Sequence, residues 1–80
     1  QTKYILEKIE RALEQAGASM SDVVRTRSFI TDISQWEDFG RAHGEFFHEI
    51  RPVSTLVEIS KLVDPAHLIE IEVDAVISDA

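Results

Sequence analysis

Residues 68–75 read LIEIEVDA, in which apolar side chains alternate with carboxylates. A period of two is typical of a β-strand that has one face against a core and the other toward water. We therefore predict a strand over residues 67–77. Its two faces are Ile69, Ile71, Val73, Ala75 and Ile77 on the apolar side and Glu70, Glu72 and Asp74 on the acidic side.

Four further segments with a regular pattern precede this strand. Residues 1–16 carry apolar side chains at helical spacing, and we expect this helix to end at Gly17. A second helical pattern runs over residues 34–49 and ends before Pro52. We expect Ser34 to cap the second helix, with Glu37 as its capping-box partner. Residues 22–32 and 53–60 have strand composition and alternation. The order helix, strand, helix, strand, strand predicts a two-layer α+β fold with both helices on one face of the sheet.

The two C-terminal strand patterns also suggest which side chains face the helices. We expect the apolar face of residues 69–75 to meet them together with Val53, Thr55, Val57 and Ile59. The opposite face would then carry the three acids with Ser54, Leu56 and Glu58. Such a semi-polar face on a small domain is typical of an oligomer interface that encloses a wet cleft.

Composition excludes several classes of protein. The 80-residue chain makes one small domain, and without cysteine it has neither disulfides nor thiolate metal ligands. No apolar run reaches the roughly 20 residues needed to cross a bilayer, so we expect no membrane contact and a cytoplasmic location. Fifteen Asp and Glu outnumber eight scattered Lys and Arg, for a net charge of −7. This balance disfavours nucleic-acid binding, which depends on clustered cations.

The polar residues leave several roles open. The acidic row could be a solvated strand face, an acid–base pair or a set of ligands for a hard cation. His43 and His48 are five apart and do not share a helix face, so we predict no metal site and expect His43 to pack against the sheet. Arg27 and Arg51 could each bind the carboxylate of a ligand, or form a surface ion pair.

Four stretches together resemble the Rid family, the reactive intermediate deaminases of the YjgF type. They are ILEKIERALEQAGASMSDVV (5–24), RTRSFITD (25–32), DFGRAHGEFFHEIRPVSTLVEISKL (38–62) and LIEIEVDAV (68–76). The resemblance implies a chorismate-mutase-like fold and a homotrimer with ligand clefts between subunits. Family members carry further strands ahead of the first helix, so residues 1–80 resemble a single domain without those strands.

The resemblance also implies a chemistry. Active Rid proteins hydrolyse enamines and imines such as 2-aminoacrylate to 2-keto acids and ammonia, without metal or cofactor. In their motif P-x-R-S-x-V-E the arginine holds the substrate carboxylate, whereas residues 52–58 read PVSTLVE and place Ser54 at that position. The family glutamate that positions the attacking water matches Glu70. Thr55 and Arg51 would line the cleft, and Arg27 or Arg51 could replace the missing cation.

Two functions therefore follow from the sequence, with a third disfavoured. The first is deaminase-type hydrolysis of a small metabolite, or a divergent form of it on a less anionic substrate, with Glu70 as the catalytic residue. The alternative is a non-catalytic trimeric module that binds a small metabolite, which the loss of the arginine favours. A ribonuclease activity, also attached to this family, conflicts with the acidic charge.

Overall fold

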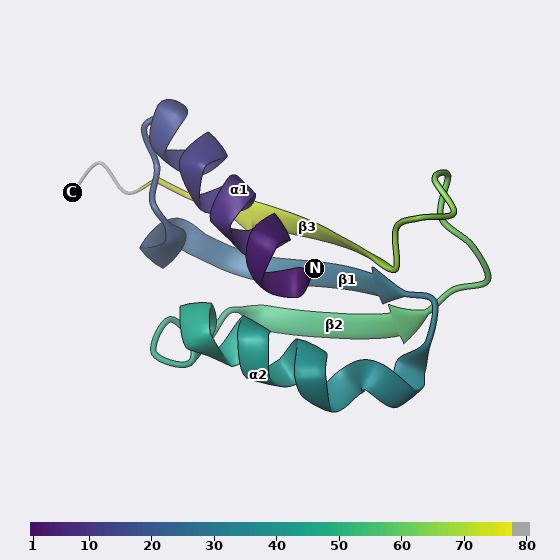
Figure 1. Cartoon of the computed structure of the whole chain (residues 1–80). Helices are drawn as coiled ribbons and strands as arrows, with labels where there is room; N and C mark the ends of the chain where they lie inside the picture. The colour runs from purple at the N-terminus through teal and green to yellow at the C-terminus, as the bar shows by residue number, and fades with distance from the viewer. Residues whose placement is uncertain (78–80) are drawn as a thin grey trace.

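The computed structural model describes residues 1–77, so residues 78–80 of the predicted domain lie outside the described part. The described elements are α1 (Thr2–Gln15), β1 (Val23–Ile30), α2 (Trp36–Phe47), β2 (Val53–Glu58) and β3 (Ile69–Ala75). One 3₁₀ turn (Met20–Asp22) leads into β1 and another (Ile33–Gln35) leads into α2. The predicted order of helices and strands is confirmed (Figure 1).

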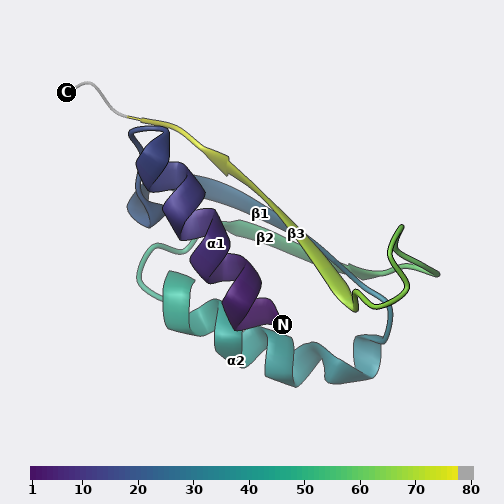
Figure 2. The same ribbon diagram turned by 45° about the horizontal axis from the view of Figure 1, so that its top comes forward.

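The three strands form one mixed sheet in the order β2-β1-β3. The central strand β1 runs parallel to β2 and antiparallel to β3. Figure 2 shows both helices on the same side of this sheet, which confirms the two-layer α+β architecture. We call the side toward the helices the inner face and the other side the outer face. In the described part of the chain β2 and β3 are both edge strands.

The hydrophobic core lies between the helices and the inner face. Its fully buried centre is Leu6 of α1, and α2 contributes two phenylalanines. Burying one such side chain contributes about 1.5–3 kcal/mol, so these few contacts account for much of the stability of a small domain. The buried apolar residues are Leu6, Met20, Val23, Ile30, Phe39, Phe47, Ile69 and Ile71.

The ends of the helices agree with the prediction at α1 and differ at α2. Gly17 adopts φ +86°, the left-handed conformation that glycine tolerates best, directly after the end of α1. Ser34, however, is not the N-cap of α2, because it lies inside the preceding 3₁₀ turn. Asp32 caps this 3₁₀ turn: its carboxylate accepts a hydrogen bond from the Ser34 backbone N–H at 3.0 Å. The N-cap of α2 itself is Gln35, without a side-chain hydrogen bond, so the predicted capping box of Ser34 and Glu37 does not form.

The predicted face of β3 is confirmed, whereas that of β2 is wrong. Ser54 pairs in register with Thr26 of β1, whose fully buried side chain lies on the inner face. Leu56 is on the same side, so the alternate residues Val53, Thr55 and Val57 point to the outer face. Both faces of β2 mix apolar and hydroxyl side chains, so its alternation does not select one. The parallel register with β1 selects it.

Candidate functional site

The outer face of the sheet carries the acidic row of β3 next to two arginines of β1. Asp74 stands opposite Arg25 and Glu72 opposite Arg27 across the antiparallel pair. Glu70, the third acid, stands opposite Phe29. The register therefore gives two of the acids a cationic neighbour and leaves the third beside a phenyl ring.

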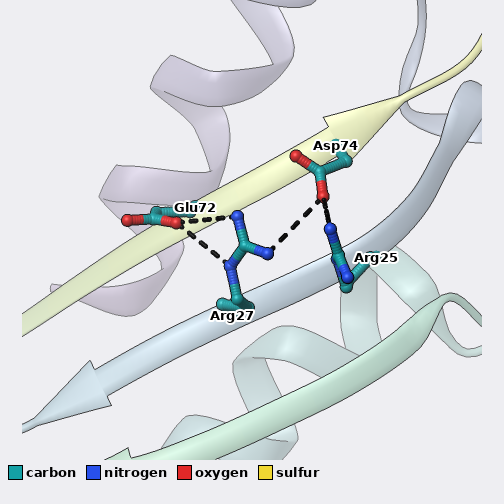
Figure 3. A network of polar contacts seen from close by, with 4 residues as sticks. All are labelled: Arg25, Arg27, Glu72 and Asp74. Atoms are coloured by element: carbon teal, nitrogen blue, oxygen red, sulfur yellow. Dashed lines mark hydrogen bonds and ion pairs between the residues drawn. The ribbon is translucent and has the colours of Figure 1, made fainter.

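Figure 3 shows the resulting ion pairs, which we call the outer-face ladder. Nη2 of Arg25 lies 2.6 Å from Oδ2 of Asp74, and both Nε and Nη2 of Arg27 lie 3.1 Å from Oε2 of Glu72. Arg27 also reaches Asp74 at 3.8 Å. The hydrogen bond from Arg25 and the positive charges of both arginines lower the pKa of Asp74.

The ladder changes what two of the predicted site residues can do. The sequence predicts that Arg27 either binds the carboxylate of a ligand or forms a surface ion pair, and its guanidinium is bound to Glu72. An anionic ligand would have to displace that carboxylate first. Within residues 1–77, Glu70 makes no side-chain hydrogen bond or ion pair, so its carboxylate is available to bind water.

A second polar cluster lies on the inner face, between β1, β2 and α2. The Thr26 hydroxyl is 2.6 Å from the Ser54 hydroxyl and 3.0 Å from Nε2 of His43. The Ser54 hydroxyl is also 3.3 Å from the same nitrogen. We call these three residues the inner-face cluster. It confirms that His43 packs against the sheet, and it joins His43 to a predicted binding residue.

The ring of His43 also contacts two phenyl rings of its own helix. Its ring packs between Phe39 and Phe47, with ring centroids 5.2 Å and 4.7 Å away. Burial of the imidazole lowers the pKa of His43, because a charged ring is disfavoured away from water. The ring is therefore neutral at neutral pH.

One more hydroxyl lies on this face. Ser28 of β1 is 1% exposed, and its Oγ has no hydrogen-bond partner within the described residues. It follows Thr26 by two positions on the same strand face, beside Leu56 and Ile71. The contrast between Thr26 and Ser28 shows that the cluster is a local arrangement around His43 and not a continuous polar stripe.

The predicted site residues do not gather at one place in the chain. Glu70 lies on the outer face of one edge strand, and Ser54 lies on the inner face of the other, with β1 between them. Thr55 lies on the outer face beside Arg27. Arg51 is exposed in the turn before β2, where it adopts φ 56°. Within one chain, Ser54 and Glu70 therefore cannot line the same cleft.

An open groove of about 1070 Å³ runs along α1 and the edge of β3 that is not paired with β1. Ile69 and Ile71 of the inner face and Glu70 of the outer face all line it. Since successive residues of a strand point to opposite faces, a groove lined by all three follows the strand edge. Glu70 thus stands where a ligand or another segment could reach it.

The structure also limits other kinds of site. Among residues 1–77, no three His, Cys, Asp or Glu side chains lie close enough together to hold a metal ion. None of the helices described is long and apolar enough to span a bilayer.

Comparison with known proteins shows the family of the chain. The family described as endoribonuclease L-PSP matches residues 1–77. The chain belongs to this family, the Rid or YjgF family that the sequence resembled. A solved structure from Mycobacterium tuberculosis, a member of the YjgF/YER057c/UK114 family, is 51% identical with a TM-score of 0.95. That match covers 96% of this chain and 65% of the other.

Two curated relatives extend this result. A RutC family protein of Pyrococcus abyssi is 38% identical over 72 residues, which are 90% of this chain and 56% of the relative. A protein of Acinetobacter baylyi named 3-aminoacrylate deaminase RutC is 37% identical over 71 residues, or 89% of this chain and 56% of the relative. The chain thus spans little more than half the length of these relatives.

Proposed function

We propose that the protein hydrolyses the enamine or imine of a small metabolite, of the 2-aminoacrylate kind, to a keto compound and ammonia. The observation that carries this proposal is the state of the three outer-face acids. Glu72 and Asp74 are bound by arginines, whereas the exposed carboxylate of Glu70 makes no side-chain hydrogen bond or ion pair within the described residues. A free carboxylate can orient a water molecule for attack on the carbon of a C=N bond. The relative named 3-aminoacrylate deaminase supports the same chemistry.

We further propose that the cleft is shared between copies of the chain, as in the homotrimer that the resemblance implies. Ser54 and Glu70 lie on opposite faces and opposite edge strands, so a cleft that uses both needs Ser54 from one copy and Glu70 from another. Arg51 and Thr55 would then approach the ligand from the β2 side. Sedimentation equilibrium of the full-length protein checks this arrangement, and a monomer that deaminates would contradict it.

The resemblance and the groove together support a proposal about the domain. We propose that strands ahead of α1 belong to the same domain and pair with the free edge of β3. An unpaired edge leaves backbone N–H and C=O groups open to another strand. The groove beside this edge has apolar walls from α1 that a strand could cover.

The test of the activity is ammonia release from 2-aminoacrylate, formed in situ by a dehydratase, with the full-length protein. Glu70→Ala should lower the rate by about 10²- to 10⁴-fold, the range for loss of a group that handles the reacting water. Glu72→Ala is the matched control, because it removes a carboxylate from the same strand face without touching the free one. Full activity in Glu70→Ala would overturn the assignment of this residue.

The same assay separates the alternative, a module that binds a metabolite without converting it. Ser54 carries no charge, and loss of a charged hydrogen bond to a carboxylate weakens binding by about 1.5–3 kcal/mol. This observation favours a less anionic substrate or a binding role. An inactive wild type that gains activity in Ser54→Arg would support the binding role, with the scaffold intact. Nuclease activity is disfavoured by the net charge of −7.

A further inference from the structure

The inner-face cluster connects a solvent-exposed hydroxyl to a half-buried base. Ser54 is exposed, Thr26 has no exposed surface, and His43 reaches Thr26 from α2. The contacts of 2.6 Å and 3.0 Å are both within the range of well-formed hydrogen bonds. A proton that arrives at Ser54 thus has a short path of two hydrogen bonds through Thr26 to Nε2 of His43, beside the longer direct contact of 3.3 Å.

The cluster contains no fixed charge. From α2 the ring of His43 meets Phe39 and Phe47, and from β1 and β2 it meets the two hydroxyls. Glu58, on the inner face of β2, accepts a hydrogen bond from the Ile33 backbone N–H at 2.9 Å. Arg25 and Arg27 belong to the outer-face ladder, and Arg41 and Glu45 of α2 are exposed. Two hydroxyls and a neutral imidazole favour an uncharged polar group over a carboxylate.

We propose that Ser54, Thr26 and His43 form a proton relay that receives the uncharged nitrogen end of a small imine or enamine, with Ser54 touching the ligand. His43 and Thr26 act through Ser54 and are positioning residues. The inference rests on the proposed function. It adds the ligand group that Ser54 contacts, which is the uncharged nitrogen, and the base that accepts the proton, which is His43.

The relay can carry every proton transfer that the hydrolysis of an imine requires. As water oxygen bonds to the C=N carbon, a water proton passes to Ser54, the Ser54 proton passes to Thr26, and the Thr26 proton passes to His43. The π electrons move to nitrogen, and the same path in reverse returns the proton to that nitrogen. In the second step the C=O bond forms as the C–N bond breaks. The hydroxyl proton of the intermediate travels along the relay to the departing ammonia.

The experiment uses Thr26→Val in the full-length protein. This variant keeps the shape of the side chain but removes the shorter route and leaves only the 3.3 Å contact between Ser54 and His43. We expect kcat for deamination to fall about 10²-fold or more with little change in KM. The acid limb of the pH profile of kcat, which follows His43, should disappear. Thr26→Ser restores the hydroxyl and should restore both. Ser28→Ala, on the same strand face but outside the relay, is the matched control and should behave as wild type.

Nuclear magnetic resonance of the three imidazoles supplies a readout that does not need turnover. Acetamide, a neutral amide, should shift the His43 signals in wild type and not in Ser54→Ala, with His48 and His67 as internal references in the same spectrum. Pyruvate, a carboxylate, should shift them less than acetamide does. The titration also shows whether each variant is folded.

The outcomes distinguish this inference from the proposed function. Deamination that persists in Thr26→Val and Ser54→Ala with an unchanged pH profile would overturn the relay and leave the function standing. An inactive wild type whose His43 signals respond to acetamide would support the cluster as a neutral-group site and contradict the deaminase. Pyruvate binding at His43 more strongly than acetamide would overturn the proposed ligand preference.

Discussion

The two faces of the sheet hold polar side chains in contrasting ways. On the outer face, four fully charged groups form the ladder while their side chains remain 39–51% exposed. On the inner face, three groups without fixed charge form a cluster around Thr26, which is 0% exposed. Water and salt screen the first network, so its ion pairs contribute little to stability, whereas breaking a buried hydrogen bond costs about 1–3 kcal/mol. The inner-face cluster therefore contributes more to the stability of the fold than the outer-face ladder does.

The difference also bears on function. The ladder occupies two arginines and two acids, so that among the three acids of β3 only Glu70 has no side-chain partner within the described residues. The cluster surrounds Ser54 with a second hydroxyl and a neutral imidazole. If the protein has the proposed function, both features favour a ligand with an uncharged polar group over a strongly anionic one.

The largest expected difference between the two faces is a difference in stability between variants of two neighbouring residues of β3. Ile71 is 9% exposed and packs in the core, whereas Glu72 is exposed on the outer face. Ile71→Ala should lower the free energy of unfolding by about 2–5 kcal/mol through lost burial and a residual cavity. Glu72→Ala should change it by less than about 1 kcal/mol. Urea unfolding followed by circular dichroism measures both, and equal losses would refute the assignment of the faces.

The two faces of the strand in LIEIEVDA could be predicted because they differ sharply in polarity, although β3 covers Ile69–Ala75 and not the whole predicted range 67–77. β2 could not, since Val53 and Thr55 are no more apolar than Ser54 and Leu56 taken together. What decides its orientation is a long-range contact, the pairing of Ser54 with Thr26. Alternation within a segment contains no information about such a pairing when both faces are mixed.

The candidate site was predictable only in part for the same reason. Resemblance pointed to Glu70, but nothing local distinguishes it from the two other acids of its row. The antiparallel register does so by placing Phe29 opposite Glu70 and arginines opposite the others. His43 was predicted as a packed residue, and its link to Ser54 appears only once α2 and β2 are brought together.

The next test is the pH dependence of stability that His43 produces. Because its pKa is lowered in the folded state, the unfolded chain binds more protons as the pH falls below the ordinary histidine value of 6.5. Stability should therefore be lost as the pH decreases through and below that value. His43→Asn should reduce this loss, and His48→Asn, at an exposed position, is the control. Urea titrations at a series of pH values measure it, and identical slopes in wild type and His43→Asn would contradict the prediction.

The smallest expected effect concerns the outer-face ladder and its response to salt. Arg27→Gln removes the contacts to Glu72 and Asp74, and its effect on the urea midpoint should be small and at least halved between about 0.05 M and 1 M NaCl. Arg41→Gln, which removes the exposed pair with Asp38, is the control for ordinary surface pairs. An effect of Arg27→Gln that resists salt, in the full-length protein, would mean that the ladder is shielded from water. Since half-exposed groups of one chain are not shielded, a second copy would have to cover the outer face. That result would strengthen the shared cleft, whereas salt sensitivity equal to that of Arg41→Gln would place the ladder in open solvent.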